Sequence, residues 1–500
     1  MNADERAGAG PGEWLARVER WAEADALLPP PRVVADERVE IGGGGAACVA
    51  CSQVELEVPY LDIAGQPQIG AARLWVREGA RAPLPLVAVM HYEMSPEGAA
   101  AYLAEGWTVL TTRQGLVAAG DSLNFGSALA HLARLLPFVD PAKIALVGGS
   151  AGGYASLMVA ADAFPLAGIV PFVPPLNLAY TMAYLHHAAE VSGCPASLPT
   201  TPEEWAELLP KLPVPVVCQV QSIVRDLEAL LGPYGENAEN WHRASPLAVW
   251  SLLTCPILLA YSTADVLVPI QQMDAQYVQR AAADEFPPGY SFDFEVVLPR
   301  RARPDTLAEV IDRDRAATFV VPVPETVPAV WEEPAGGAEP FSIESPFSGD
   351  KPVSLVILDE GPPHPRATHT KRRLDVSHLA FLRHCFSRPI APEALTRAKL
   401  ARLMQRFVGQ EPDGLLDCRA SQPQPLRRRS SPVREKADVL VGLRTYVESG
   451  VGQANAQRLA VLYAALPEPL RALDEPGRPF EADVRGNVRR AIEQCGLTAR

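Results

Sequence analysis

One short run, Gly148–Gly152, reads G-x-S-x-G and constrains the fold more than any other segment. The apolar residues Ile144–Val147 before it predict a buried strand, and Ala155–Ala163 after it predicts a helix. A strand that becomes a helix within one or two residues holds the serine in a strained conformation, and glycines must flank it so that the backbone can double back. The pattern therefore predicts a sharp turn that exposes the Ser150 hydroxyl.

The same turn brings reactive groups together. The first backbone N–H groups of a helix have no partner inside that helix, so we expect the Ala151 N–H to point at an oxygen held near Ser150. A dinucleotide loop requires G-x-G-x-x-G and a P-loop requires G-K-[ST], and the run matches neither. The alternative is a glycine turn with an incidental serine. We predict that Ser150 is a nucleophile and that Ala151 donates one bond to an oxyanion.

A serine nucleophile needs a carboxylate and a histidine, which follow it in the chain order Ser, acid, His. The next predicted core strand, Pro256–Ala260, leads into a loop that carries Asp265. This is where a carboxylate is required to orient an imidazole. The alternative is that Asp265 caps the following helix. We predict that Asp265 is the acid.

The predicted strand Val353–Leu358 is followed by a loop that contains both His364 and His369. Proline on each side of His364 restricts its backbone, whereas His369 precedes a predicted helix start, so we favour His369 as the base and keep His364 as the alternative. The other histidines considered are expected on helices or on the surface: His186, His187, His378 and His384.

The second oxyanion donor is expected in the loop after the predicted strand Leu86–Met90. This loop begins with His91 and Tyr92 and contains no glycine before Met94. We predict that the Tyr92 N–H is the donor and that His91 packs beneath it.

Strands alternate with helices along the chain, which predicts an α/β fold with a mainly parallel central sheet and helices on both faces. The alternation is interrupted by a mainly helical stretch, expected to form a cap, and the chain ends in a small helical appendage. The predicted units are 1–52 (N-terminal helix and extension), 53–175 (first part of the core), 176–252 (cap), 253–410 (second part of the core, with an insertion at 299–351), 421–436 (linker) and 437–500 (appendage).

Charge and composition exclude several partners. The 500 residues include 45 Lys and Arg against 59 Asp and Glu, a net charge of -14, which disfavours nucleic acid. No apolar run is long enough to span a membrane, and the residues after Met1 do not predict a signal peptide. Cysteines such as Cys218, Cys255 and Cys385 lie in apolar segments and are expected to be reduced core thiols, so a cytoplasmic location is expected. No second ligand pair accompanies Cys48-x-x-Cys51, so no metal is expected.

These motifs resemble the α/β-hydrolase superfamily, and within it the prolyl-oligopeptidase and dienelactone-hydrolase-like branch. The likeness rests on Gly148–Tyr154, on Ser245–Leu247 and on Pro256–Pro269, and it spans roughly Leu86 to Phe386. It implies the α/β-hydrolase fold and a Ser–His–Asp triad without metal or organic cofactor. Prolyl oligopeptidases carry a large β-propeller before the hydrolase domain, and the residues before Leu86 are too few to form one.

Three functions follow as expectations. The first is hydrolysis of carboxylic esters by acyl transfer to Ser150. The second is a prolyl-oligopeptidase-like peptidase or amidase with the same residues, and the third is a hydrolase-fold protein that binds a ligand without turning it over. The expected partner is a small-molecule or peptide substrate. A homo-oligomer is possible through the helical appendage.

Overall fold

The computed structural model describes a defined part of the chain. The described residues are 31–42, 48–61, 67–81, 83–113, 119–136, 138–160, 166–212, 215–233, 241, 244–247, 250, 253, 255–273, 309–311, 313–322, 351–360 and 375–388. Several predicted features lie outside them: the N-terminal helix, most of the 299–351 insertion, the 421–436 linker, the 437–500 appendage, and the loop with His364 and His369.

Within the described residues, ten strands form one sheet in the order β1-β2-β3-β5-β4-β6-β7-β8-β10-β9. The first three strands are antiparallel to their neighbours, and every pair from β5 to β9 is parallel. The strands are β1 (Arg32–Ile41), β2 (Val49–Leu61), β3 (Pro67–Arg77), β4 (Leu84–Val89), β5 (Thr108–Thr112), β6 (Val139–Gly149), β7 (Gly168–Phe172), β8 (Ile257–Ser262), β9 (Ala316–Pro322) and β10 (Val353–Asp359).

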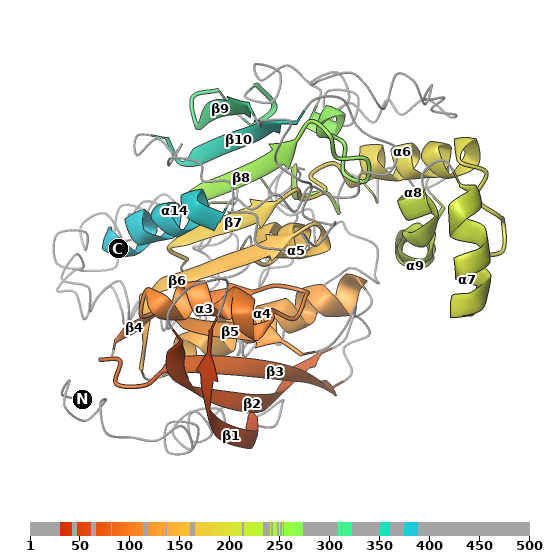
Figure 1. The fold of residues 1–500 in the computed structure, drawn as a ribbon. Coiled ribbons are helices and arrows are strands. Elements are labelled where there is room, and N and C mark those ends of the chain that lie inside the picture. Colours follow the sequence, from red (N-terminus) through yellow and green to blue (C-terminus); the bar gives the residue numbers. More distant parts are fainter. Residues whose placement is uncertain are drawn as a thin grey trace, which may run out of the picture.

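Helices cover both faces of this sheet (Figure 1). They are α3 (Pro96–Ala104) and α14 (Asp375–Ser387) on one face, and α4 (Ala119–Leu135) and α5 (Ala151–Ala160) on the other. In β4, Leu86 and Ala88 pack on the side of α4 and α5, whereas Val87 and Val89 pack on the side of α3 and α14. A strand buried on both sides has to be apolar throughout, which is why these strands were readable as continuous apolar runs. The predicted α/β fold is confirmed.

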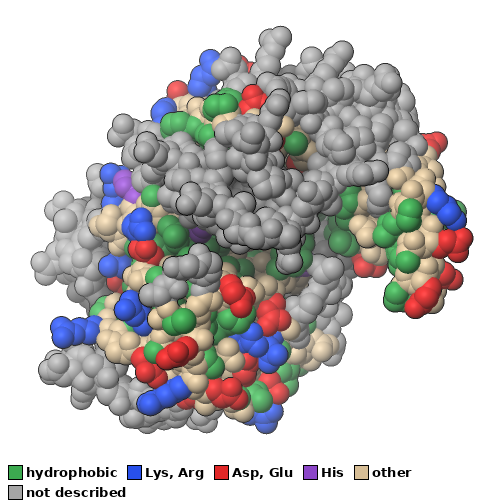
Figure 2. Space-filling view, in the orientation of Figure 1, with side chains coloured by type: hydrophobic (Ala, Val, Ile, Leu, Met, Phe, Trp, Pro, Cys, Tyr) green, Lys and Arg blue, Asp and Glu red, His purple; other side chains and the backbone are tan. Residues whose placement is uncertain are grey.

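The edge formed by β1, β2 and β3 is the part of the sheet that the sequence did not fully predict. Strand β1 was not predicted from the sequence. Its central residues Asp36–Arg38 are polar and exposed, so its alternation is interrupted. Figure 2 shows acidic and basic side chains intermixed over this edge, where Arg32 pairs with Glu57.

Between β7 and β8 the described residues are mainly helical. They form α6 (Leu178–Val191), α7 (Pro202–Leu208), the 3-10 helix η2 (Leu209–Lys211), α8 (Pro215–Gln219) and α9 (Gln221–Leu231), which project to one side of the sheet (Figure 1). At the start of α7 the Thr201 hydroxyl accepts a bond from the Glu204 N–H, and the Glu204 carboxylate accepts one from the Thr201 N–H. This capping box fixes the residue at which α7 begins.

The expectation of a reduced thiol was wrong for Cys218. The structure pairs Cys218 on α8 with Cys194, just after α6, as a disulfide with Cα atoms 5.5 Å apart. The two residues are 24 positions apart and belong to no spacing motif, so the sequence offered no sign of the contact. Cys255 and Cys385 are buried thiols, as expected. Among the described helices, none is long and apolar enough to cross a membrane.

Gly70 of β3 gives a direct test of the packing between sheet and helix. A Cβ on Gly70 would lie 2.1 Å from the Phe125 ring of α4, and both residues are buried. We expect Gly70→Ala to lower the free energy of unfolding by about 1–3 kcal/mol, because the ring has to move in a filled core. Urea unfolding measures this change.

The matched control is the same substitution beside a smaller side chain. In a Phe125→Leu background the added methyl group meets less resistance, so the cost of Gly70→Ala should shrink. Equal costs in the two backgrounds would show that the ring does not oppose the methyl group.

Candidate active site

The strand-to-helix turn holds Ser150 as the sequence predicted. Ser150 lies between β6 and α5 with a φ of +53°, a conformation that few non-glycine residues adopt. Its N–H donates to the Phe172 carbonyl on β7 at 2.8 Å, and its carbonyl accepts from the Tyr154 N–H at 3.0 Å. These two bonds join the strained residue to the next strand and to the following helix.

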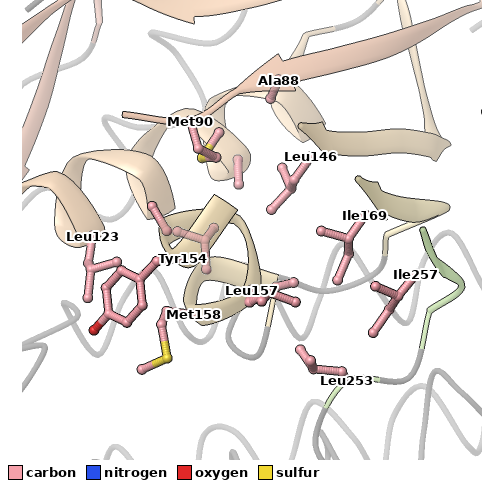
Figure 3. Packing of buried hydrophobic residues seen from close by; sticks show 14 of the residues in the cluster. Ala88, Met90, Leu123, Leu146, Tyr154, Leu157, Met158, Ile169, Leu253 and Ile257 are labelled. Carbon is pink, nitrogen blue, oxygen red and sulfur yellow. The ribbon is translucent and has the colours of Figure 1, made fainter. Parts of the chain in front are cut away.

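The glycines beside Ser150 are required by contacts with the backbone. A Cβ on Gly148 would lie 2.3 Å from the Gly152 carbonyl oxygen, and one on Gly152 would lie 2.6 Å from the Met90 carbonyl oxygen. Below the turn, α5 is anchored by apolar packing: Figure 3 shows Leu157 among Leu146 and Ile169 of the adjacent strands. The packed residues below the turn therefore hold the backbone of Ser150 in place.

The structure changes the prediction for the second oxyanion donor. The Tyr92 N–H already donates to the Met90 carbonyl at 2.8 Å, so it is not the available donor that was predicted. The Tyr92 side chain instead lies against the turn, because a Cβ on Gly152 would lie 3.4 Å from its ring, and its hydroxyl interacts with the Ser150 side chain. Burial raises the pKa of this hydroxyl, and the interaction with Ser150 acts in the opposite direction. Ala151, the other predicted donor, is the first residue of α5, where an N–H has no partner within the helix.

His91 packs against the ring of Tyr92. Its φ is +70°, and its Nδ1 lies 2.6 Å from the Ser122 hydroxyl on α4. The two rings meet edge to face with centroids 4.4 Å apart. Burial lowers the pKa of the His91 imidazole from 6.5 to about 4, so the ring is neutral at physiological pH.

Asp265 is buried, with 3% of its surface exposed, in the loop after β8. Its Oδ1 accepts bonds from the N–H groups of Leu267 and Val268, both at 2.9 Å. These bonds close a local turn inside the loop, and they are not the helix cap considered as the alternative, because the next helix begins only at Ile270. The turn is compatible with a second role for Asp265, because a carboxylate has two oxygens and about four acceptor positions.

Two tyrosines lie close to Asp265. The Tyr184 hydroxyl donates to the Val266 carbonyl, and the Tyr261 hydroxyl donates to the Pro174 carbonyl, both at 2.6 Å. Burial first, and the Asp265 charge second, raise the pKa of both hydroxyls. Both tyrosines therefore stay protonated and fix the backbone around the carboxylate.

The buried Gln272 amide connects this loop to the start of α6. Gln272 lies in the 3-10 helix η4 (Ile270–Met273), and its Oε1 accepts bonds from the N–H groups of Leu176 and Asn177 at 2.7 and 3.2 Å. Neither this amide nor the Tyr92 hydroxyl was identified from the sequence. Both depend on contacts between segments far apart in the chain.

The loops after β8 and β10 are joined to each other. The Ser262 hydroxyl donates to the Glu360 carboxylate, and the Glu360 N–H donates to the Thr263 hydroxyl at 3.0 Å. The chain therefore leaves β10 beside the loop of Asp265. The two histidines considered for the base, His364 and His369, follow in this chain direction and lie outside the described residues.

Where the structure describes their contacts, the histidines expected on helices or on the surface contact residues other than Ser150 and Asp265. His186 is exposed and lies 2.7 Å from the Glu228 carboxylate, while the side chain of His187 is outside the described part. His378 and His384 lie on α14, as predicted, and His378 packs edge-on against Phe172 and Tyr102. Among the described residues, no group of three His, Cys, Asp or Glu side chains is placed to hold a metal ion.

The lowered pKa of His91 predicts how stability depends on pH. Between pH 6.5 and about 4 the His91 imidazole is protonated in the unfolded chain but neutral in the folded protein. The free energy of unfolding therefore falls as the pH decreases through this range. We expect His91→Asn to show a smaller fall, because Asn does not titrate and tolerates positive φ. Urea unfolding at a series of pH values measures both slopes, and identical slopes would contradict the lowered pKa.

No family model matches the chain, and no curated protein matches it. Solved structures match parts of it: a puromycin hydrolase (15% identity, 74% of this chain and 46% of that one, TM-score 0.33), Candida antarctica lipase A (15%, 51% and 74%, 0.31) and an esterase from Pyrococcus furiosus (14%, 71% and 92%, 0.33). The chain spans less than half the length of the puromycin hydrolase. This chain has the α/β-hydrolase fold, because a mainly parallel sheet with helices on both faces carries Ser150 on a sharp strand-to-helix turn.

Proposed function

We propose that this protein is a serine hydrolase that cleaves carboxylic esters by acyl transfer to Ser150. One observation carries the proposal: Ser150 occupies a strained turn at the start of α5, and the Tyr92 side chain lies against this turn. Strain of this kind persists only where the surrounding structure enforces it, and it concentrates at functional sites.

The proposed first step is attack of the Ser150 oxygen on the ester carbonyl carbon. The loop histidine, for which we favour His369, takes the serine proton, and Asp265 holds the imidazole in the tautomer that accepts it. Negative charge develops on the carbonyl oxygen. The Ala151 N–H and the Tyr92 hydroxyl are proposed to donate to this oxygen.

The intermediate then collapses to an acyl-serine. The histidine returns its proton to the leaving alcohol, and in the second half of the reaction it takes a proton from water, which attacks the acyl carbon. The bond between the acyl carbon and the Ser150 oxygen then breaks, the histidine returns the proton to that oxygen, and the carboxylic acid leaves. The order of strands supports this assignment. Ser150 and Asp265 follow β6 and β8, whose carboxyl ends lie at one edge of the sheet with β7 between them, and the loop of the two histidines follows the adjacent β10.

Ser150 labelling tests the nucleophile. We expect a fluorophosphonate probe to label the folded protein, and labelling to disappear in Ser150→Ala, because the probe reacts with an activated serine. Ser95→Ala is the matched control: Ser95 is an exposed serine at the start of helix α3, but its φ is -71° and it lies outside the turn. It should label like the parent.

Two results would overturn the proposal: folded protein that does not label, or label that persists in Ser150→Ala. The substrate class is tested in parallel with p-nitrophenyl acetate and aminoacyl-anilides. Turnover of the ester alone supports an esterase. Turnover of the anilides at a comparable rate would instead support a peptidase or amidase.

The two loop histidines provide a matched pair of variants. We expect His369→Ala to lower kcat for p-nitrophenyl acetate by about 10³-fold or more, as loss of a triad member does, and His364→Ala to retain most activity. Steady-state kinetics on variants with parent-like circular dichroism measure both. The opposite ranking would make His364 the base, and two active variants would remove both histidines from the mechanism.

A further inference from the structure

The Tyr92 hydroxyl can stabilise an oxyanion only if the loop that carries it stays in place. This loop, residues 90–94, leaves the sheet at the end of β4 and contains two consecutive constraints: the positive φ of His91 and the bond from the Tyr92 N–H to the Met90 carbonyl. Tyr92 itself is 37% exposed, so core packing alone does not hold it.

Thr111 of β5 contacts the backbone of this loop at two points. Its hydroxyl oxygen accepts a bond from the Met94 N–H at 3.0 Å, and it lies 3.3 Å from the Tyr92 carbonyl, to which it donates. The Thr112 carbonyl lies at 3.3 Å as well, so the single hydroxyl hydrogen is shared between two acceptors. Thr111 is fully buried and pairs in register with Val89, the last residue of β4.

Other side chains hold the loop at different residues. Ser122 bonds to the His91 ring, and the Glu93 carboxylate lies 2.9 Å from the Arg73 guanidinium. Ser122 and Arg73 contact side chains of the loop. Thr111 instead forms hydrogen bonds with the backbone on both sides of residue 93, at Tyr92 and at Met94. It therefore restrains the Tyr92 carbonyl directly.

We propose that Thr111 is a positioning residue for the acyl transfer: its buried hydroxyl fixes the 90–94 loop so that the Tyr92 hydroxyl stays at Ser150. This proposal rests on the function proposed above. Thr111 does not touch the reacting atoms, so it would affect the reaction only through the position of Tyr92.

Thr108 provides a control on the same strand. It is also fully buried, but its hydroxyl has no hydrogen-bond partner among the described residues. Replacing either threonine by valine keeps the shape and removes one hydroxyl. The two variants therefore differ in whether a bond to the 90–94 loop is lost.

The experiment measures kcat and KM for p-nitrophenyl acetate in four variants and the parent. Loss of one oxyanion donor costs about 10²–10³-fold in kcat, so we expect about a 10²-fold loss in Tyr92→Phe. Thr111→Val misplaces the donor without removing it, and we expect a loss of about tenfold in kcat with little change in KM. Thr111→Ser should restore most of the rate, and Thr108→Val should match the parent.

A double variant separates positioning from a general structural effect. In the Tyr92→Phe background the hydroxyl is already absent, so Thr111→Val should cause no further loss of kcat. Thermal unfolding of each variant checks that the fold is intact. The proposal is overturned if the two losses multiply, or if Thr111→Val has the same kcat as Thr108→Val.

The outcome is distinct from a failure of the proposed function. If the parent neither labels at Ser150 nor turns over ester, the hydrolase proposal fails, and with it the role of Thr111. If the parent is active and Thr111→Val is as active as Thr108→Val, the hydrolase proposal stands and only the role of Thr111 is rejected.

Discussion

The close approach of α5 to the ends of β4 and β6 is the constraint on which the rest of the site depends. Gly152 sits against the Met90 carbonyl, and Gly148 sits against the Gly152 carbonyl, at distances that leave no space for a side chain. This approach gives Ser150 its positive φ and brings the start of a helix beside the loop of Tyr92. A larger residue at either glycine would separate α5 from β4, and the serine, the helix N-terminus and the tyrosine would no longer meet.

A parallel sheet supplies the remaining geometry. Because β4, β6, β8 and β10 are parallel members of one sheet, the loops that follow them emerge at one edge. Hydrogen bonds between these loops then reduce their freedom, as in the bond from Glu360 to Thr263. The residues proposed for acyl transfer are far apart in sequence, and the sheet brings their loops together without requiring any of them to be neighbours in the chain.

The sequence predicted the parts of this structure that depend on local pattern. The turn at Ser150, the buried strands and the position of Asp265 after β8 each follow from a short run of residues. The Tyr92 hydroxyl, the Thr111 bonds and the Cys194–Cys218 pair do not, because each depends on contacts across the fold. The prediction that the Tyr92 N–H is available as a donor failed, because the backbone geometry that occupies this N–H is not visible in a sequence. The choice between His364 and His369 stays a prediction.

The Gln272 amide has a mechanical consequence for the molecule. Its oxygen holds the backbone N–H groups of Leu176 and Asn177, the last residues before α6, while its own backbone belongs to the segment that follows Asp265. Tyr184 of α6 adds a second link, because its hydroxyl donates to the Val266 carbonyl next to Asp265. A displacement of α6 would therefore be transmitted to the loop of the carboxylate through two buried side chains. The helical segment and the loop of the acid are therefore expected to move together, because Gln272 and Tyr184 both join them.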